Sequence, residues 1–152
     1  MQGFVIDNNM PGDLELTEYS ISTLAWVGDA VFELFIRTRL AWENKEASGA
    51  LHRKATSFVS ARGQACLMGC LLTEDSSFLL EDKERNLLQR ARNFHTASTP
   101  KNVDLSDYRQ ATAFEALIGW LWLCGNQERV MELIKHVLQE SQMKGQTNES
   151  TR

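Results

Sequence analysis

Apolar residues recur every three or four positions along most of the chain, and this helical spacing limits the possible folds more than any other feature. Only two prolines interrupt the spacing, Pro11 and Pro100. No alternation typical of strands and no internal repeat is visible. The spacing therefore predicts an all-α protein, and 152 residues with 43% hydrophobic content suit one compact domain.

Capping residues and helix breakers divide the predicted domain, residues 17–142, into six helices. Thr17 is a suitable N-cap for the first helix, and Ser48 and Ser60 are suitable for the next two. The fourth helix begins with acidic residues and ends with two arginines, as the helix dipole favours. The predicted helices run from Thr17 to Trp42, from Ser48 through LHRKATSF, from Ser60 through ARGQACLMGCLL, over 81–93, from Ser106 to Cys124 and from Gln127 to Gln142.

The two ends of the chain are polar. Residues 1–16 are predicted to be an N-terminal extension, and residues 143–152, MKGQTNESTR, a disordered polar tail. The first residues carry acids where a secretory signal would be basic and then apolar, and no segment reaches the roughly 18 apolar residues of a membrane span. We therefore expect a cytoplasmic protein with no membrane partner. The net charge of −4 argues against a generally basic nucleic-acid binder but leaves room for a local basic patch.

Three cysteines, Cys66, Cys70 and Cys124, show no CxxC spacing. The first two lie one helical turn apart beside leucines and a methionine. We interpret all three as ordinary core thiols, with a metal or disulfide role as the alternative.

Two acids interrupt strongly apolar helical sequence. Asp29 lies in LAWVGDAVFELF and Glu115 in ATAFEALIGWLWL. Because an unpaired buried carboxylate is costly, each acid needs a partner. The two could face each other and share a divalent cation such as Mg²⁺, which prefers oxygen ligands. Alternatively each pairs with an arginine, for which these residues are available: Arg37, Arg62, Arg92 and Arg109. Glu33, one turn beyond Asp29, is either a further ligand or a solvated or arginine-paired residue.

These segments resemble a known family. LAWVGDAVFELF is similar to the signature helix of the ribonuclease III family, and TAFEALIGWLWL to its second catalytic helix. Between them LHRKATSFVSARGQA, RARN, TPKNVD and YRQATAFEALIG follow in the same order and with similar gaps as in Mini-ribonuclease III. That bacterial subgroup consists of the nuclease domain without a double-stranded-RNA-binding domain.

The resemblance implies a ribonuclease III-like helical endonuclease that is a homodimer and cuts double-stranded RNA with Mg²⁺. The implied substrate is the stem at the ends of the 23S ribosomal RNA precursor, cut during ribosome biogenesis. A large-subunit ribosomal protein on that precursor is a further candidate partner.

The resemblance assigns the metal and the catalysis to Asp29 of the GDA motif and Glu115 of the FEA motif. Two family carboxylates are replaced in this chain, by Ala25 four residues before Asp29 and by Thr112 three residues before Glu115. Both replacements are similar to the Mini-ribonuclease III pattern. Fewer anionic ligands leave more of the metal coordination to water and RNA phosphate, with one or two ions per site.

RNA contact is predicted around the loop before the fifth helix, because A-form RNA is read mainly through its shape and backbone. The candidate residues are Arg90, Arg92, Thr99, Lys101, Asn102 and Arg109, with His52 and Lys54 as weaker candidates. The resemblance also places Trp26 in a contact across the dimer axis. Trp26 falls away from the main apolar side of its helix, as an interface anchor would. A second core face within one subunit is the alternative.

Two other functions stay open from the residues alone. One is a catalytically silent ribonuclease III fold that binds RNA or the ribosome. The other is a helical nucleotide pyrophosphohydrolase, although such enzymes usually show ExxE pairs, and none lies beside an apolar run here.

Overall fold

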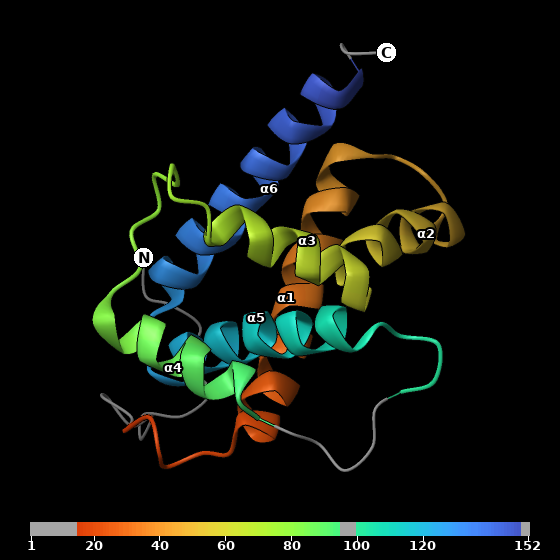
Figure 1. Ribbon diagram of the computed structural model, residues 1–152. Coiled ribbons are helices and arrows are strands. Elements are labelled where there is room, and N and C mark those ends of the chain that lie inside the picture. The colour runs from red at the N-terminus through yellow and green to blue at the C-terminus, as the bar shows by residue number, and fades with distance from the viewer. Residues whose placement is uncertain (1–14, 95–99, 150–152) are drawn as a thin grey trace.

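The computed structural model describes residues 15–94 and 100–149, with side chains described up to residue 145. Within these ranges the chain forms helices and no strands, which confirms the all-α prediction (Figure 1). None of these helices is long and apolar enough to cross a bilayer. The elements are α1 (Ile21–Glu43), α2 (Ser48–Val59), α3 (Ala61–Leu71), α4 (Asp82–Arg92), α5 (Leu105–Leu123) and α6 (Gln127–Glu149).

Helix α5 lies at the centre of the fold and contacts α1, α3, α4 and α6. Its middle is buried on all sides, as expected of a helix that is apolar around its whole circumference. It crosses α1 at two glycines. A Cβ at Gly28 would overlap the carbonyl oxygen of Glu115, and a Cβ at Gly119 would overlap that of Leu24. The two backbones are therefore in direct contact, and only glycine fits on either side.

Next to this crossing, the rings of Phe32 and Phe114 meet edge to face, with centroids 5.1 Å apart. Both rings are fully buried. Edge-to-face contacts between buried aromatic rings add to the stabilisation that burial itself provides. Together with the glycine crossing, they fix the relative position of α1 and α5.

Several predicted helix ends differ from the structure. Helix α1 begins after Ser20, whose hydroxyl accepts from the amide of Thr23, rather than at Thr17. Helix α2 includes Ser48 and has Ala47 as its N-cap, whereas Ser60 caps α3 as predicted. Helix α6 does not end near Gln142 but continues to Glu149, so most of the segment predicted as a disordered tail is helical. Polar composition alone does not end a helix, because exposed polar residues are tolerated once a preceding apolar face is packed. Residues 1–14 and 150–152 lie outside the described ranges.

The link between α3 and α4 is fixed to α6 by one arginine. Arg129 donates to both carboxylate oxygens of Glu84, at 2.6 and 3.1 Å, and to the carbonyl of Leu79 at 2.7 Å. Its guanidinium also lies 4.0 Å from the centroid of the Phe78 ring. Glu84, only 1% exposed, additionally closes the capping box of α4 with Glu81. Because Glu84 is buried and both of its carboxylate oxygens accept from Arg129, the pair is of the kind that proteins tolerate in the interior.

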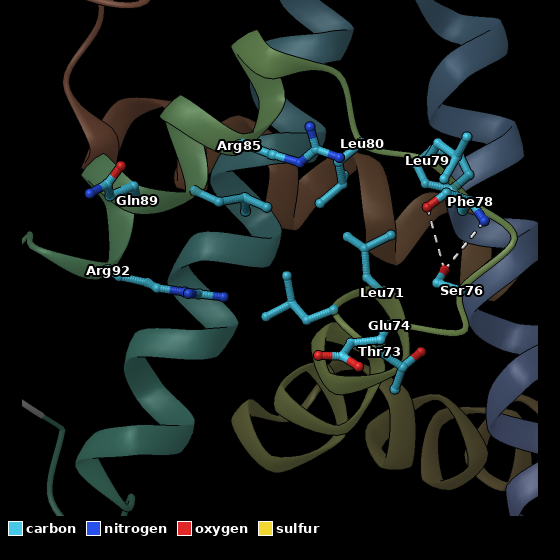
Figure 2. A pocket seen from close by; sticks show the side chains of 12 residues that line it. Leu71, Thr73, Glu74, Ser76, Phe78, Leu79, Leu80, Arg85, Gln89 and Arg92 are labelled. Carbon is cyan, nitrogen blue, oxygen red and sulfur yellow. Dashed lines mark hydrogen bonds between the residues drawn. The ribbon is translucent and has the colours of Figure 1, made fainter.

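A pocket of about 530 Å³ lies between the end of α3, the following loop and α4 (Figure 2). Leucines from α3 and the loop form one wall, while Arg85, Gln89 and Arg92 of α4 line the other. Neither Asp29 nor Glu115 lines this pocket, so the two acids singled out from the sequence lie elsewhere.

Candidate active site

Asp29 of α1 and Glu115 of α5 lie together at the glycine crossing. Asp29 directly follows Gly28, and the carbonyl that Gly28 meets is that of Glu115 itself. The two carboxyl groups hydrogen-bond to each other through their side chains. The interpretation that pairs each acid with an arginine therefore does not describe this site, since the acids pair with each other.

The two carboxyl groups differ in burial, and both have a raised pKa. Burial is the main cause at Glu115, and the nearby charge of Asp29 adds to it, raising the pKa of Glu115 from 4.5 to about 8. At Asp29, which is more exposed, burial and then the charge of Glu33 raise the pKa above 3.8. Because its pKa is about 8, Glu115 keeps its proton at neutral pH when no cation is bound, and it donates to the carboxyl group of Asp29. A divalent cation would replace that proton and relieve the repulsion.

The residues around the pair supply few other metal ligands. Among the described residues, no group of three or more His, Cys, Asp or Glu side chains is placed to hold a metal ion. At the two positions where the family has carboxylates, Ala25 is buried and the Thr112 hydroxyl donates to the carbonyl of Tyr108 at 2.9 Å. Glu33 pairs with Arg37 at 2.6 Å. Asp29 and Glu115 thus fit a hard cation whose remaining ligands are water and substrate oxygens.

Sequence reasoning missed one polar residue of this site, Gln64 on α3. Its side chain is 1% exposed and lies beside the Glu115 carboxyl, whose pKa it lowers, against the larger raising effects of burial and Asp29. The available signal is its position, because Gln64 takes the place of an apolar residue in the spacing that continues with Leu67, Met68 and Leu71.

The predicted RNA contacts lie on several elements. Arg92 ends α4 and lines the pocket of Figure 2. Lys101 is exposed and lies in the segment that precedes α5. The adjacent Asn102 has a φ of 71°, a conformation that asparagine tolerates better than most residues. Arg109 lies on α5. Thr99 lies outside the described residues.

Three other residues predicted to contact RNA lie on α4 and α2, and two of them already bind other groups of the chain. Arg90 donates to the carbonyl oxygens of Leu16 and Tyr19, so its guanidinium ties the segment before α1 to α4. Lys54 on α2 lies 2.7 Å from the Glu46 carboxylate and 3.1 Å from Asn44 Oδ1. His52, also on α2, is exposed. Their roles in RNA binding remain predictions.

Trp26 is 77% exposed on α1, which excludes the alternative that it belongs to a second core face within one subunit. Ala30 and Leu34 follow it at intervals of four residues, and both are exposed. The three side chains form an exposed apolar strip along α1 next to Asp29.

The cysteines play no part in this site. None of the three forms a disulfide within the described residues. Cys70 is buried, which raises the pKa of its thiol. Cys66 is exposed and Cys124 only partly buried, so the prediction of core thiols is wrong for Cys66.

Comparison with known proteins identifies the family to which this combination of helices and acids belongs. The model of the Ribonuclease III domain matches residues 22–126, which cover α1 from its second residue and the whole of α2 through α5, with both acids. The chain therefore belongs to the ribonuclease III family and is an endoribonuclease of the type that cuts double-stranded RNA. This family assignment excludes the nucleotide pyrophosphohydrolase. Members of this family generally depend on a divalent metal.

The relatives narrow the assignment to Mini-ribonuclease III. Mini-ribonuclease 3 of Enterococcus faecalis is 40% identical over 126 residues, which cover 83% of this chain and 91% of that protein. Mini-ribonuclease 3 of a Thermoanaerobacter species is 34% identical, covering 92% and 97%. A crystal structure of a protein from Fusobacterium nucleatum is similar with a TM-score of 0.71 and 26% identity, covering 85% of this chain and 99% of that one.

Proposed function

We propose that Asp29 and Glu115 jointly bind Mg²⁺ and that the protein uses it to hydrolyse phosphodiester bonds in double-stranded RNA. The observation that carries this proposal is the direct contact of the two carboxyl groups, held by the backbone contact between Gly28 and Glu115. Two acids forced together at the cost of a raised pKa are typical of a cation site.

Phosphodiester hydrolysis needs an activated water in line with the leaving oxygen and positive charge near the phosphate. Mg²⁺, when bound, supplies both. Glu115, the more buried of the two acids, would release its proton to solvent and hold the cation as an anionic ligand. Asp29, on the exposed side, would be the second ligand, beside which water and an RNA phosphate have access. No covalent enzyme intermediate is required.

The strip formed by Trp26, Ala30 and Leu34 is proposed to contact a second copy of the chain. Exposed tryptophans beside small and aliphatic residues often anchor protein interfaces. Because the strip lies on the same helix as Asp29, a homodimer would place two equivalent sites near one duplex, one for each strand.

The proposed substrate is the terminal stem of the 23S ribosomal RNA precursor, cut in the bacterial cytoplasm. Similarity to Mini-ribonuclease 3 over most of the chain supports this choice. A large-subunit ribosomal protein bound to the precursor is proposed as an accessory partner. Phosphate contacts are assigned to Arg92, Lys101, Asn102 and Arg109, with Arg90, Thr99, His52 and Lys54 as further candidates.

The test is cleavage of a 23S precursor stem by Asp29→Asn in buffered Mg²⁺, with the cut ends mapped. We expect the rate to fall at least 100-fold while the circular dichroism spectrum stays unchanged, because the substitution removes a metal ligand without changing its shape. Asp82→Asn, an exposed acid on α4, is the matched control and should cleave normally. Full Mg²⁺-dependent cleavage by Asp29→Asn would refute the metal assignment. If the protein cleaved other RNA duplexes but not this stem, the proposal that the stem is its substrate would be refuted.

A further inference from the structure

Gln64 is a polar residue where α3 should be apolar. It shares the buried side of the helix with Leu67, Met68 and Leu71. Its amide Nε2 is buried and has no hydrogen bond of normal geometry among the described residues. Burial of an unpaired amide is unfavourable, so a glutamine here calls for an explanation other than packing.

The backbone holds Gln64 firmly. Ser60 caps α3 by accepting from the amide of Gly63, and a Cβ at Gly63 would overlap the carbonyl oxygen of Ser57 in α2. Gln64 thus follows a glycine fixed by close backbone contact, just as Asp29 follows Gly28. Both polar groups are attached to backbone that cannot shift easily.

The Gln64 side chain lies beside one group that can accept from its amide, the carboxyl group of Glu115. Helix α3 packs directly on α5, and the two side chains interact there. An amide that donates to a carboxylate stabilises the ionised form and restricts its orientation. Groups of this kind, which hold metal ligands in place without touching the metal, commonly tune metal sites.

Such support matters more here because the site has few carboxylates. Ala25 offers no oxygen, and the Thr112 hydroxyl is engaged with Tyr108. The orientation of Glu115 then depends on the groups that surround its carboxyl.

We propose that Gln64 is a positioning residue of the metal site, whose amide holds the Glu115 carboxylate toward Asp29. The proposal rests on the proposed function, since it assumes that Asp29 and Glu115 bind the metal. It predicts that the amide is needed for metal affinity and not for stability.

The experiment measures Mn²⁺ binding to the free protein by isothermal titration calorimetry, alongside thermal unfolding without metal. Gln64→Met keeps the length of the side chain and removes the amide. We expect Mn²⁺ to bind about tenfold more weakly, while the unfolding temperature stays the same or rises, because an unpaired buried amide is replaced by an apolar group. A merely structural glutamine would instead lower the unfolding temperature and leave the affinity unchanged.

The matched control is Gln110→Met, because Gln110 on α5 also has a buried side-chain atom without a hydrogen-bond partner, its Oε1. Its Mn²⁺ affinity should equal that of the unchanged protein, and an equal loss would overturn the proposal. If Gln64→Met does not fold, Gln64→Asn withdraws the amide by one methylene and should weaken Mn²⁺ binding likewise. Unchanged affinity in the folded variant, or failure of both variants to fold, would also overturn it.

Asp29→Asn separates this inference from the proposed function. If that variant binds Mn²⁺ normally, the metal assignment itself is wrong and the role of Gln64 falls with it. If it loses Mn²⁺ while Gln64→Met binds normally, only the role of Gln64 is wrong.

Discussion

Replacing Glu115 by glutamine should change how the stability of the metal-free protein depends on pH. The raised pKa of Glu115 means that the folded state holds a proton which the unfolded state releases near pH 4.5. The resulting stabilisation is complete below pH 4.5 and is lost as the pH rises to about 8. Glutamine cannot ionise and can still donate to Asp29, so it removes this part of the pH dependence.

The size of the effect follows from the two pKa values. At about 1.4 kcal/mol per pH unit, the change from 4.5 to about 8 corresponds to on the order of 4 kcal/mol at pH 8. The variant should therefore resemble the unchanged protein at pH 5 and be more stable than it at pH 8. For a domain of this size, about 2–4 °C per kcal/mol gives an unfolding temperature roughly 10 °C higher at pH 8.

The assay is thermal unfolding in EDTA from pH 5 to pH 9, followed by circular dichroism. Glu43→Gln, an exposed carboxylate at the end of α1, serves as the control and should keep the pH dependence of the unchanged protein. Parallel pH curves for Glu115→Gln and the unchanged protein would refute the reasoning, because they would show that Glu115 holds no proton in the metal-free fold.

Two further substitutions test the crossing and the interface. Gly28→Ala should lower the free energy of unfolding, measured by denaturant titration, by about 3 kcal/mol or more, because its Cβ would overlap the Glu115 carbonyl. The control is Gly69→Ala, which has open space around it and should be neutral or slightly stabilising. Equal stability of the two variants would contradict the crossing. Trp26→Ala should weaken dimerisation about 30-fold or more in sedimentation equilibrium; Trp42→Ala, equally exposed on α1, should not, and identical behaviour would remove Trp26 from the interface.

The helices could be predicted because they depend on local patterns, whereas the same patterns left the partner of Asp29 and Glu115 open between a shared cation and separate arginines. Apolar spacing defines helices, and an acid within such spacing indicates a need for a partner. The structure adds that the two acids differ in burial, since Asp29 lies at the exposed edge of the crossing. Spacing cannot distinguish the middle of a buried face from its edge.

What the sequence did not show depends on contacts between distant residues. Arg90 was predicted to contact RNA because it lies beside the loop before α5, yet its guanidinium donates to the carbonyls of Leu16 and Tyr19. Gln64 was overlooked because nothing near it in the sequence distinguishes a buried glutamine from an exposed one. The partners of Arg90, and the proposed partner of Gln64, come from segments that are distant in the sequence.

The contact between Gly28 and Gly119 also limits how this enzyme can be altered. Because the two backbones already touch, with Gly28 N only 2.9 Å from where a Cβ of Gly119 would lie, the helices cannot move closer to suit a smaller ion. Selectivity among cations must then be adjusted through side chains rather than through the separation of α1 and α5. The distance between α1 and α5 is therefore fixed, while the number of acidic ligands can differ among related nucleases.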